Sequence, residues 1–108
     1  MGDCYEANAK KILFDAKFEK ATLVHGVAMN SQDNKPMGHC WLEIGDTCYD
    51  FANGKAWEVE KALYYEVGLV KTYLAGGYKI YKYTKKQVQE NIVTIGHWGA
   101  WEETGCQR

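Results

Sequence analysis

The sequence predicts an α+β fold in which helices pack on one antiparallel β-sheet. Three observations lead to this class: capped helical patterns at both ends of the chain, β-like segments joined by two-residue turns, and a helical segment between two hairpins. The order helix–strand–strand–strand–helix–strand–strand–helix is typical of α+β proteins. A chain of 108 residues has the length of a single domain, residues 1–108, with one modest core.

The first helix is predicted from its start signal and its spacing. Asp3 can cap it, and Glu6 lies three residues later, as in a capping box. Apolar residues then recur with the helical period, so we expect a helix from Cys4 to about Phe18. A β-like segment (21–29) and a polar loop closed by the only proline follow.

The remaining elements are predicted from turns and caps. Gly45–Asp46 is a good two-residue turn between the segments HCWLEI and TCYDFA. A helical segment then stops at Gly68, and Gly76–Gly77 separate two further β-like segments. Thr84 can cap the last helix. The expected ranges are strands 39–44 and 47–52, helix 55–68, strands 69–75 and 78–84, and helix 85–95.

Composition and charge argue against several classes of protein. The formal net charge is −1 and the lysines are scattered, so no basic stripe indicates a nucleic-acid partner. No apolar run approaches the roughly 18 residues needed to span a bilayer, and no charged-then-apolar leader opens the sequence. We therefore expect a cytoplasmic protein with neither nucleic acid nor membrane as a partner.

The first hairpin brings a histidine close to an aspartate. With Gly45–Asp46 as a two-residue turn, Ile44 pairs with Thr47. The same register makes His39 and Asp50 diagonal cross-strand neighbours on one face. A carboxylate in this position accepts the Nδ1–H bond of the imidazole and leaves Nε2 to handle a proton. The pair therefore predicts acid–base chemistry.

Other residues of the hairpin are assigned to faces by the same alternation. Trp41, Glu43 and Cys48 share the face of His39, whereas Cys40 points to the opposite face. This arrangement argues against a Cys40–Cys48 disulfide. Cys48 lies on a strand without a helix dipole to favour its thiolate, so we rank it below Cys4 as a nucleophile.

Cys4 is the best-placed nucleophile because it lies in the first turn of a predicted helix. Unsatisfied N–H groups and the helix dipole favour a thiolate there. A nearby imidazolium lowers the pKa of such a thiol further, whereas the neighbouring carboxylate of Asp3 is a smaller, opposing influence. Cys4, His39 and Asp50 are thus the candidate catalytic residues.

These residues resemble the transglutaminase-like branch of the papain-like cysteine enzymes. The matching segments are DCYEANAKKIL, LVHGVA, GHCWLEI and TCYDFANG, which cover about half of the chain. The resemblance implies a papain-like/transglutaminase-like core, with the cysteine-bearing helix packed on the sheet. It also implies a cysteine-dependent acyl-transfer enzyme without a cofactor. We expect hydrolysis of an amide or isopeptide bond in a peptide or protein, by a peptidase, amidase or deamidase.

The sequence departs from the family pattern at the oxyanion hole. Papain-type enzymes carry a glutamine several residues before the nucleophile, and only three residues precede Cys4. The Cys4 N–H then needs a second donor to stabilise an oxyanion. The candidates are an indole N–H of Trp41, Trp98 or Trp101, the hydroxyl of Tyr5 and the amide of Asn53.

Two other functions stay open at this point. Four tryptophans and eight tyrosines can form the recognition surface of a non-enzymatic binding module on a papain-like scaffold. A zinc site could combine Cys40, Cys48 and a histidine, although no ligand spacing favours it.

Several further residues have two possible roles. His25, His97, Trp98 and Trp101 are possible substrate contacts or structural residues, Glu43 either orients a neighbour or faces solvent, and one of Tyr64 and Tyr65 is expected in the core.

Overall fold

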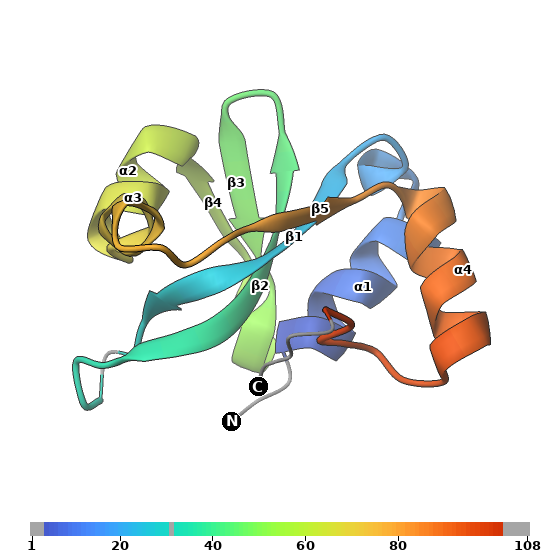
Figure 1. The fold of residues 1–108 in the computed structure, drawn as a ribbon. Coiled ribbons are helices and arrows are strands. Elements are labelled where there is room, and N and C mark those ends of the chain that lie inside the picture. The colour runs from blue at the N-terminus through green and yellow to red at the C-terminus, as the bar shows by residue number, and fades with distance from the viewer. Residues whose placement is uncertain (1–3, 31, 103–108) are drawn as a thin grey trace.

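The computed structural model describes residues 4–30 and 32–102 and has a five-stranded antiparallel sheet in the order β4-β3-β2-β1-β5 (Figure 1). The elements are α1 (Cys4–Phe14), the 3-10 helix η1 (Ala16–Phe18), β1 (Thr22–Met29), β2 (Pro36–Ile44), β3 (Thr47–Asp50), the 3-10 helix η2 (Ala52–Gly54), β4 (Trp57–Glu60), α2 (Lys61–Val67), α3 (Val70–Ala75), β5 (Tyr81–Tyr83) and α4 (Lys85–Ile95). The predicted α+β class is confirmed.

Helices cover both faces of the sheet and divide the core in two (Figure 1). On one face, α1 and α4 contribute Ile12 and Val88, which pack with Leu23 and Leu42 of the sheet. On the other face, α2 and α3 pack against Trp41. Alternate residues of β2 therefore enter different cores, as the period of a strand requires. In the described ranges, no helix has the length and apolar character needed to cross a bilayer.

The first hairpin follows the predicted register. Ile44 pairs with Thr47, and Leu42 pairs with Tyr49. Gly45 has a φ of 59°, the left-handed conformation that a tight hairpin turn requires and that glycine adopts without steric cost. Cys40 and Cys48 enter different cores and are free thiols, as expected for side chains on opposite faces.

The first helix is shorter than predicted. It ends at Phe14 because Asp15 adopts an extended backbone and its carboxylate accepts a hydrogen bond from the Lys17 N–H at 3.0 Å. This cap starts the separate 3-10 helix η1, and Phe18 still reaches the core. Asp3, the predicted cap of α1, lies outside the described residues.

The predicted helix 55–68 is wrong in its first half. Residues 57–60 form β4, which pairs with β3 from Thr47↔Glu60 to Asp50↔Trp57. Pairing with the open edge of β3 gives the backbone N–H and C=O groups of this segment hydrogen-bond partners. The stabilisation from this long-range pairing outweighs the local helix propensity. The helix α2 therefore begins only at Lys61.

The predicted second hairpin is also wrong, because 70–75 is the helix α3 rather than a strand. Leu69 has a left-handed backbone (φ 58°) that lets a helix start directly after α2. Val70 and Leu74 then lie one turn apart and pack into the core around Trp41, which explains why a β-rich composition is helical here. The strand β5 pairs with β1 instead.

Glu43 joins the sheet to α2 through a buried carboxylate. It accepts hydrogen bonds from the Trp41 indole at 2.9 Å and from the Tyr65 hydroxyl, and the Lys61 ammonium lies 3.7 Å away. Truncation of Glu43 would leave these donors buried without an acceptor. We therefore expect Glu43→Ala to lower the free energy of unfolding by about 2–4 kcal/mol in urea titrations. The exposed strand residue Glu58, changed to alanine, is the control and should cost less than about 0.5 kcal/mol. Equal losses in the two variants would contradict this role.

Candidate active site

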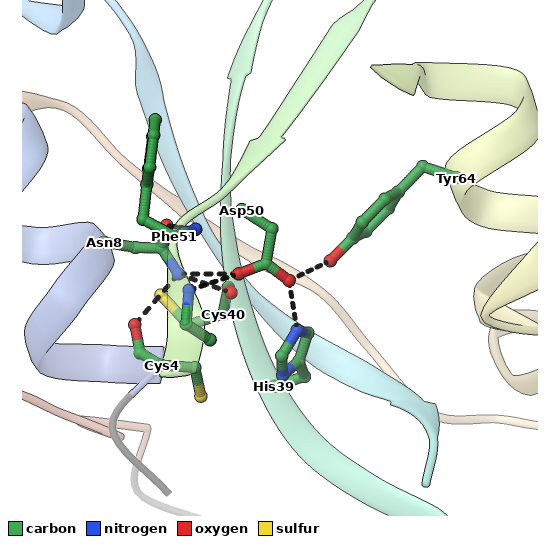
Figure 2. A network of polar contacts seen from close by, with 8 residues as sticks. Cys4, Asn8, His39, Cys40, Asp50, Phe51 and Tyr64 are labelled. Carbon is green, nitrogen blue, oxygen red and sulfur yellow. Dashed lines mark hydrogen bonds and ion pairs between the residues drawn. The ribbon is translucent and has the colours of Figure 1, made fainter. Parts of the chain in front are cut away.

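Cys4 begins α1, and its thiol lies at the lower end of the network in Figure 2. The residue is 5% exposed and packs in the core beneath α1. The Cys4 carbonyl accepts a hydrogen bond from the Asn8 side-chain amide, one turn later, at 3.0 Å. Backbone N–H groups in a first helical turn have no intrahelical acceptor, so the sequence places this thiol in an electropositive environment.

His39 and Asp50 are in direct contact, as the hairpin register predicts. The Nε2–H of His39 donates to Oδ2 of Asp50 at 2.8 Å. The sequence predicts that Nδ1 contacts the carboxylate, and this prediction is wrong. Strand pairing fixes where the two backbones lie but not how the ring is rotated. Nδ1 is therefore the nitrogen left for Cys4.

The electrostatics of His39 connect it to both predicted partners. Burial lowers the pKa of the imidazole, but hydrogen bonds and charge interactions with Asp50 and with Cys4 outweigh burial and raise it to about 9. Burial raises the pKa of Asp50, yet its hydrogen bond and charge interaction with His39, together with the Ala52 N–H and Asn8, lower it overall. At neutral pH the ring is therefore protonated and the carboxylate ionised.

Asp50 is held by groups from several elements (Figure 2). Oδ1 accepts from the Ala52 N–H at 3.0 Å and from the Asn8 amide at 3.3 Å. Oδ2 accepts from the Tyr64 hydroxyl at 3.0 Å as well as from His39. The carboxylate is thus fixed in the orientation that directs one oxygen at the imidazole.

Asn8 and Tyr64 are site residues that the sequence reasoning missed. Asn8 is fully buried and also bonds the Cys40 carbonyl and the Phe51 N–H, each at 3.0 Å. Its position four residues after Cys4, on the same helical face, is a signal that could have found it. Nothing local distinguishes Tyr64 from a core tyrosine, because its partner Asp50 is reached only through the packing of α2.

Trp41 does not have the oxyanion role predicted for it. The side chain is fully buried on the face of α2 and α3, and its indole N–H donates to Glu43. Its indole therefore contributes to the core beside His39, whose ring centroid lies 6.0 Å away. The indole N–H of Trp101 is likewise engaged, by the His97 carbonyl at 2.8 Å.

The other oxyanion candidates lie in different places. Asn53 is exposed in η2 with a left-handed backbone. Trp98 packs against the core beneath α1, with the ammonium of Lys10 5.5 Å from its ring centroid. Tyr5 follows Cys4 directly and lines a groove of the described structure.

This groove has a volume of about 950 Å³ and is lined in part by chain neighbours of the candidate pair. Tyr5 and Gly38, which adjoin Cys4 and His39 in sequence, line it together with His25, His97 and Gly99. Of the four possible substrate contacts, His25 and His97 line this groove, whereas Trp98 and Trp101 do not.

The remaining thiols differ from Cys4. Burial, together with the nearby Glu43 carboxylate, raises the pKa of Cys48 to about 12, and burial raises the pKa of Cys40 well above its ordinary value. Cys106 lies outside the described residues. Within those residues, no cluster of three or more histidine, cysteine or acidic side chains has the arrangement of a metal site, so the zinc alternative gains no support.

Most of the aromatic side chains in the described residues are only partly exposed, so few of them are available for a broad recognition surface. Among the described aromatic residues, only Phe14, Trp57 and Tyr78 are largely exposed.

Comparisons with protein-family models, with curated proteins and with solved structures find no match. The function of the chain must therefore be inferred from the geometry of the site.

The raised pKa of His39 predicts how stability changes with pH. The folded-state pKa of about 9 exceeds the ordinary 6.5, so the stabilisation is complete below pH 6.5 and is lost as pH rises to about 9. We expect the free energy of unfolding to fall by on the order of 1–3 kcal/mol across this window, measured by urea titration at several pH values. His39→Gln, whose amide can donate to Asp50 without titrating, should lack this fall. Parallel losses in both proteins would rule out the coupling.

Proposed function

We propose that the chain is a cysteine-dependent acyl-transfer enzyme that hydrolyses an amide or isopeptide bond of a peptide or protein, on a papain-like/transglutaminase-like scaffold. The observation that carries this proposal is the His39 imidazole, which has the Cys4 thiol and the Asp50 carboxylate as its two polar partners. A thiol, an imidazole and an orienting carboxylate are the groups that nucleophilic acyl transfer requires.

The first chemical step would form a thioester. The Cys4 thiolate attacks the carbonyl carbon, a carbon–sulfur bond forms, and the carbonyl electrons move onto oxygen. The carbon–nitrogen bond then breaks, and the leaving amine takes the proton from Nδ1 of His39. Asp50 stays ionised throughout and holds Nε2, so the ring keeps one orientation while Nδ1 loses its proton.

The second step would return the enzyme to its starting state. Neutral His39 removes a proton from water, and the resulting hydroxide adds to the thioester carbonyl. The carbon–sulfur bond breaks, the acid leaves, and the thiolate–imidazolium pair is restored. An amine in place of water would give transfer rather than hydrolysis by the same proton movements.

Access to the sulfur follows from the relative exposure of the pair. Cys4 is 5% exposed, whereas the His39 side chain is 19% exposed. A substrate carbonyl therefore approaches along the imidazole side. The N–H groups of the first turn of α1, which have no acceptor within the helix itself, are suitable donors for the oxyanion that develops there.

Selective alkylation tests the proposal. Near pH 6.5, iodoacetamide should modify Cys4 at least about tenfold faster than Cys40 or Cys48, because burial keeps the latter two protonated. Peptide mapping by mass spectrometry after timed quenching gives the rate at each thiol. His39→Ala should abolish the advantage of Cys4, since no imidazolium then stabilises its thiolate.

A matched control keeps this result specific to the pair. His97→Ala removes an exposed histidine outside the pair and should leave the Cys4 rate unchanged. The proposal fails if Cys4 reacts no faster than the other buried thiols in the wild-type protein, or if the two histidine variants behave alike.

A further inference from the structure

Tyr64 is a tyrosine of α2 whose hydroxyl shares an acceptor atom with the candidate catalytic imidazole. The hydroxyl donates to Oδ2 of Asp50 at 3.0 Å, and the Nε2–H of His39 donates to the same oxygen at 2.8 Å. Figure 2 shows the two donors approaching this oxygen from different sides. The tyrosine ring packs beside Trp41, with ring centroids 5.4 Å apart, in the core that α2 and α3 cover. Helix and core therefore set the direction of the hydroxyl.

The other donors to Asp50 use its second oxygen. The Ala52 N–H and the Asn8 amide donate to Oδ1, at 3.0 and 3.3 Å. Asn8 also bonds backbone carbonyls of α1 and β2, so its removal would disturb the backbone of the site. Loss of the Tyr64 hydroxyl, in contrast, takes one donor away from the oxygen that His39 uses. A change at Tyr64 therefore acts directly on the bond between imidazole and carboxylate.

Two donors on one oxygen share the same negative charge. Each hydrogen bond that a carboxylate accepts stabilises its ionised form and lowers its affinity for a proton. The Tyr64 hydroxyl therefore weakens the hold of Asp50 on the proton of the His39 imidazolium. Burial and the charge of Asp50 keep the pKa of this hydroxyl well above its usual range. It consequently stays protonated and acts as a donor at neutral pH.

A second histidine of the chain has the same set of partners. His25 on β1 is 1% exposed, and its Nδ1 lies 2.7 Å from Oε2 of Glu102, which also accepts from the Tyr83 hydroxyl at 2.6 Å. The rings of Tyr5, Tyr83 and Trp101 enclose this imidazole, with centroids at 4.8, 5.1 and 4.9 Å. Its Nε2 is buried without a hydrogen-bond partner among the described residues. Because the proposed chemistry does not use His25, its resonances can serve as an internal reference for changes at the candidate site.

We propose that Tyr64 is a positioning residue that sets the acidity of the His39 imidazolium through the Asp50 oxygen that they share. The inference rests on the proposed function and deepens it, because there His39 gives a proton to the leaving amine and later takes one from water. The hydroxyl makes the imidazolium a stronger acid for the first transfer. It also allows the neutral ring to form at a lower pH for the second.

The other titratable groups around His39 and Asp50 can be separated from this effect. From α1, the Cys4 thiol interacts with the imidazole and raises its pKa. From β2 and β3, Cys40 and Cys48 interact with the tyrosine hydroxyl, but burial raises the pKa of both thiols, that of Cys48 to about 12, so they stay neutral. Cys4→Ala therefore leaves Asp50 as the charged partner of the imidazole within the described part of the chain.

An NMR titration of His39 in a Cys4→Ala background tests the proposal. Tyr64→Phe keeps the ring and removes only the hydroxyl, and it should raise the measured pKa of His39 by about 0.5–1 unit. Tyr65→Phe is the matched control, because Tyr65 is the next residue of α2 and its hydroxyl donates to Glu43 instead. This control should leave the pKa of His39 within about 0.2 units of its starting value. An unchanged or lower pKa in Tyr64→Phe, or an equal rise in both variants, would overturn the proposal.

A stronger donor at the same position tests the opposite direction. 3,5-Difluorotyrosine in place of Tyr64 has a more acidic hydroxyl and should lower the pKa of His39, a change that a purely structural contact would not produce. This variant also decides the question if Tyr64→Phe does not fold, because an unchanged or raised pKa then overturns the proposal. The resonances of His25 should keep their positions in all variants, since its own carboxylate and phenol are untouched.

The titration gives its answer whether or not Cys4 is reactive. A raised pKa of His39 in Tyr64→Phe supports the role of Tyr64 even if iodoacetamide shows that Cys4 is not activated. An unchanged pKa removes that role even if Cys4 is alkylated selectively. Failure of this inference and failure of the proposed function are thus separate results.

Discussion

The geometry of the candidate site depends on the buried carboxylate of Asp50. Desolvating a carboxylate costs several kcal/mol unless its lone pairs are satisfied. Here the Ala52 N–H, the Asn8 amide, the Tyr64 hydroxyl and the His39 imidazole all donate to it. Because these donors come from the following turn, from α1, from α2 and from β2, the satisfaction of one charge fixes four elements around the end of β3. A displacement of any of them would leave a buried charge short of a donor.

Asn8 extends this constraint to Cys4. Its amide nitrogen contacts the carbonyls of Cys4 and Cys40 as well as Asp50, and its oxygen accepts the Phe51 N–H. A single buried side chain therefore ties the start of α1 to two neighbouring strands. Cys4 is thus positioned through its backbone carbonyl, by a contact that its thiol does not make.

The sequence predicted the parts of the site that depend on local rules. A two-residue turn fixes the hairpin register, and the register alone brings His39 to Asp50. The parts that were missed depend on tertiary packing: the donor Tyr64 arrives with α2, and the edge of β3 makes a strand of 57–60. The composition of the α3 segment predicts a strand, because valine, threonine and tyrosine favour strands, whereas its packing against the sheet makes it helical. Strand register does not determine how a side chain is rotated. The sequence therefore could not predict which ring nitrogen of His39 contacts Asp50.

Consecutive residues of α1 serve two different histidines. Successive side chains on a helix diverge by about 100°, so Cys4 and Tyr5 project in different directions from the same first turn. Cys4 interacts with His39 and helps to raise the pKa of its imidazole, whereas the Tyr5 ring lies edge-on to His25. Both imidazoles are oriented by a carboxylate, but only His39 has a thiol as its second polar partner, and only His25 has an orphaned nitrogen. The same pairing of imidazole and carboxylate thus occurs once beside a thiol and once among aromatic rings.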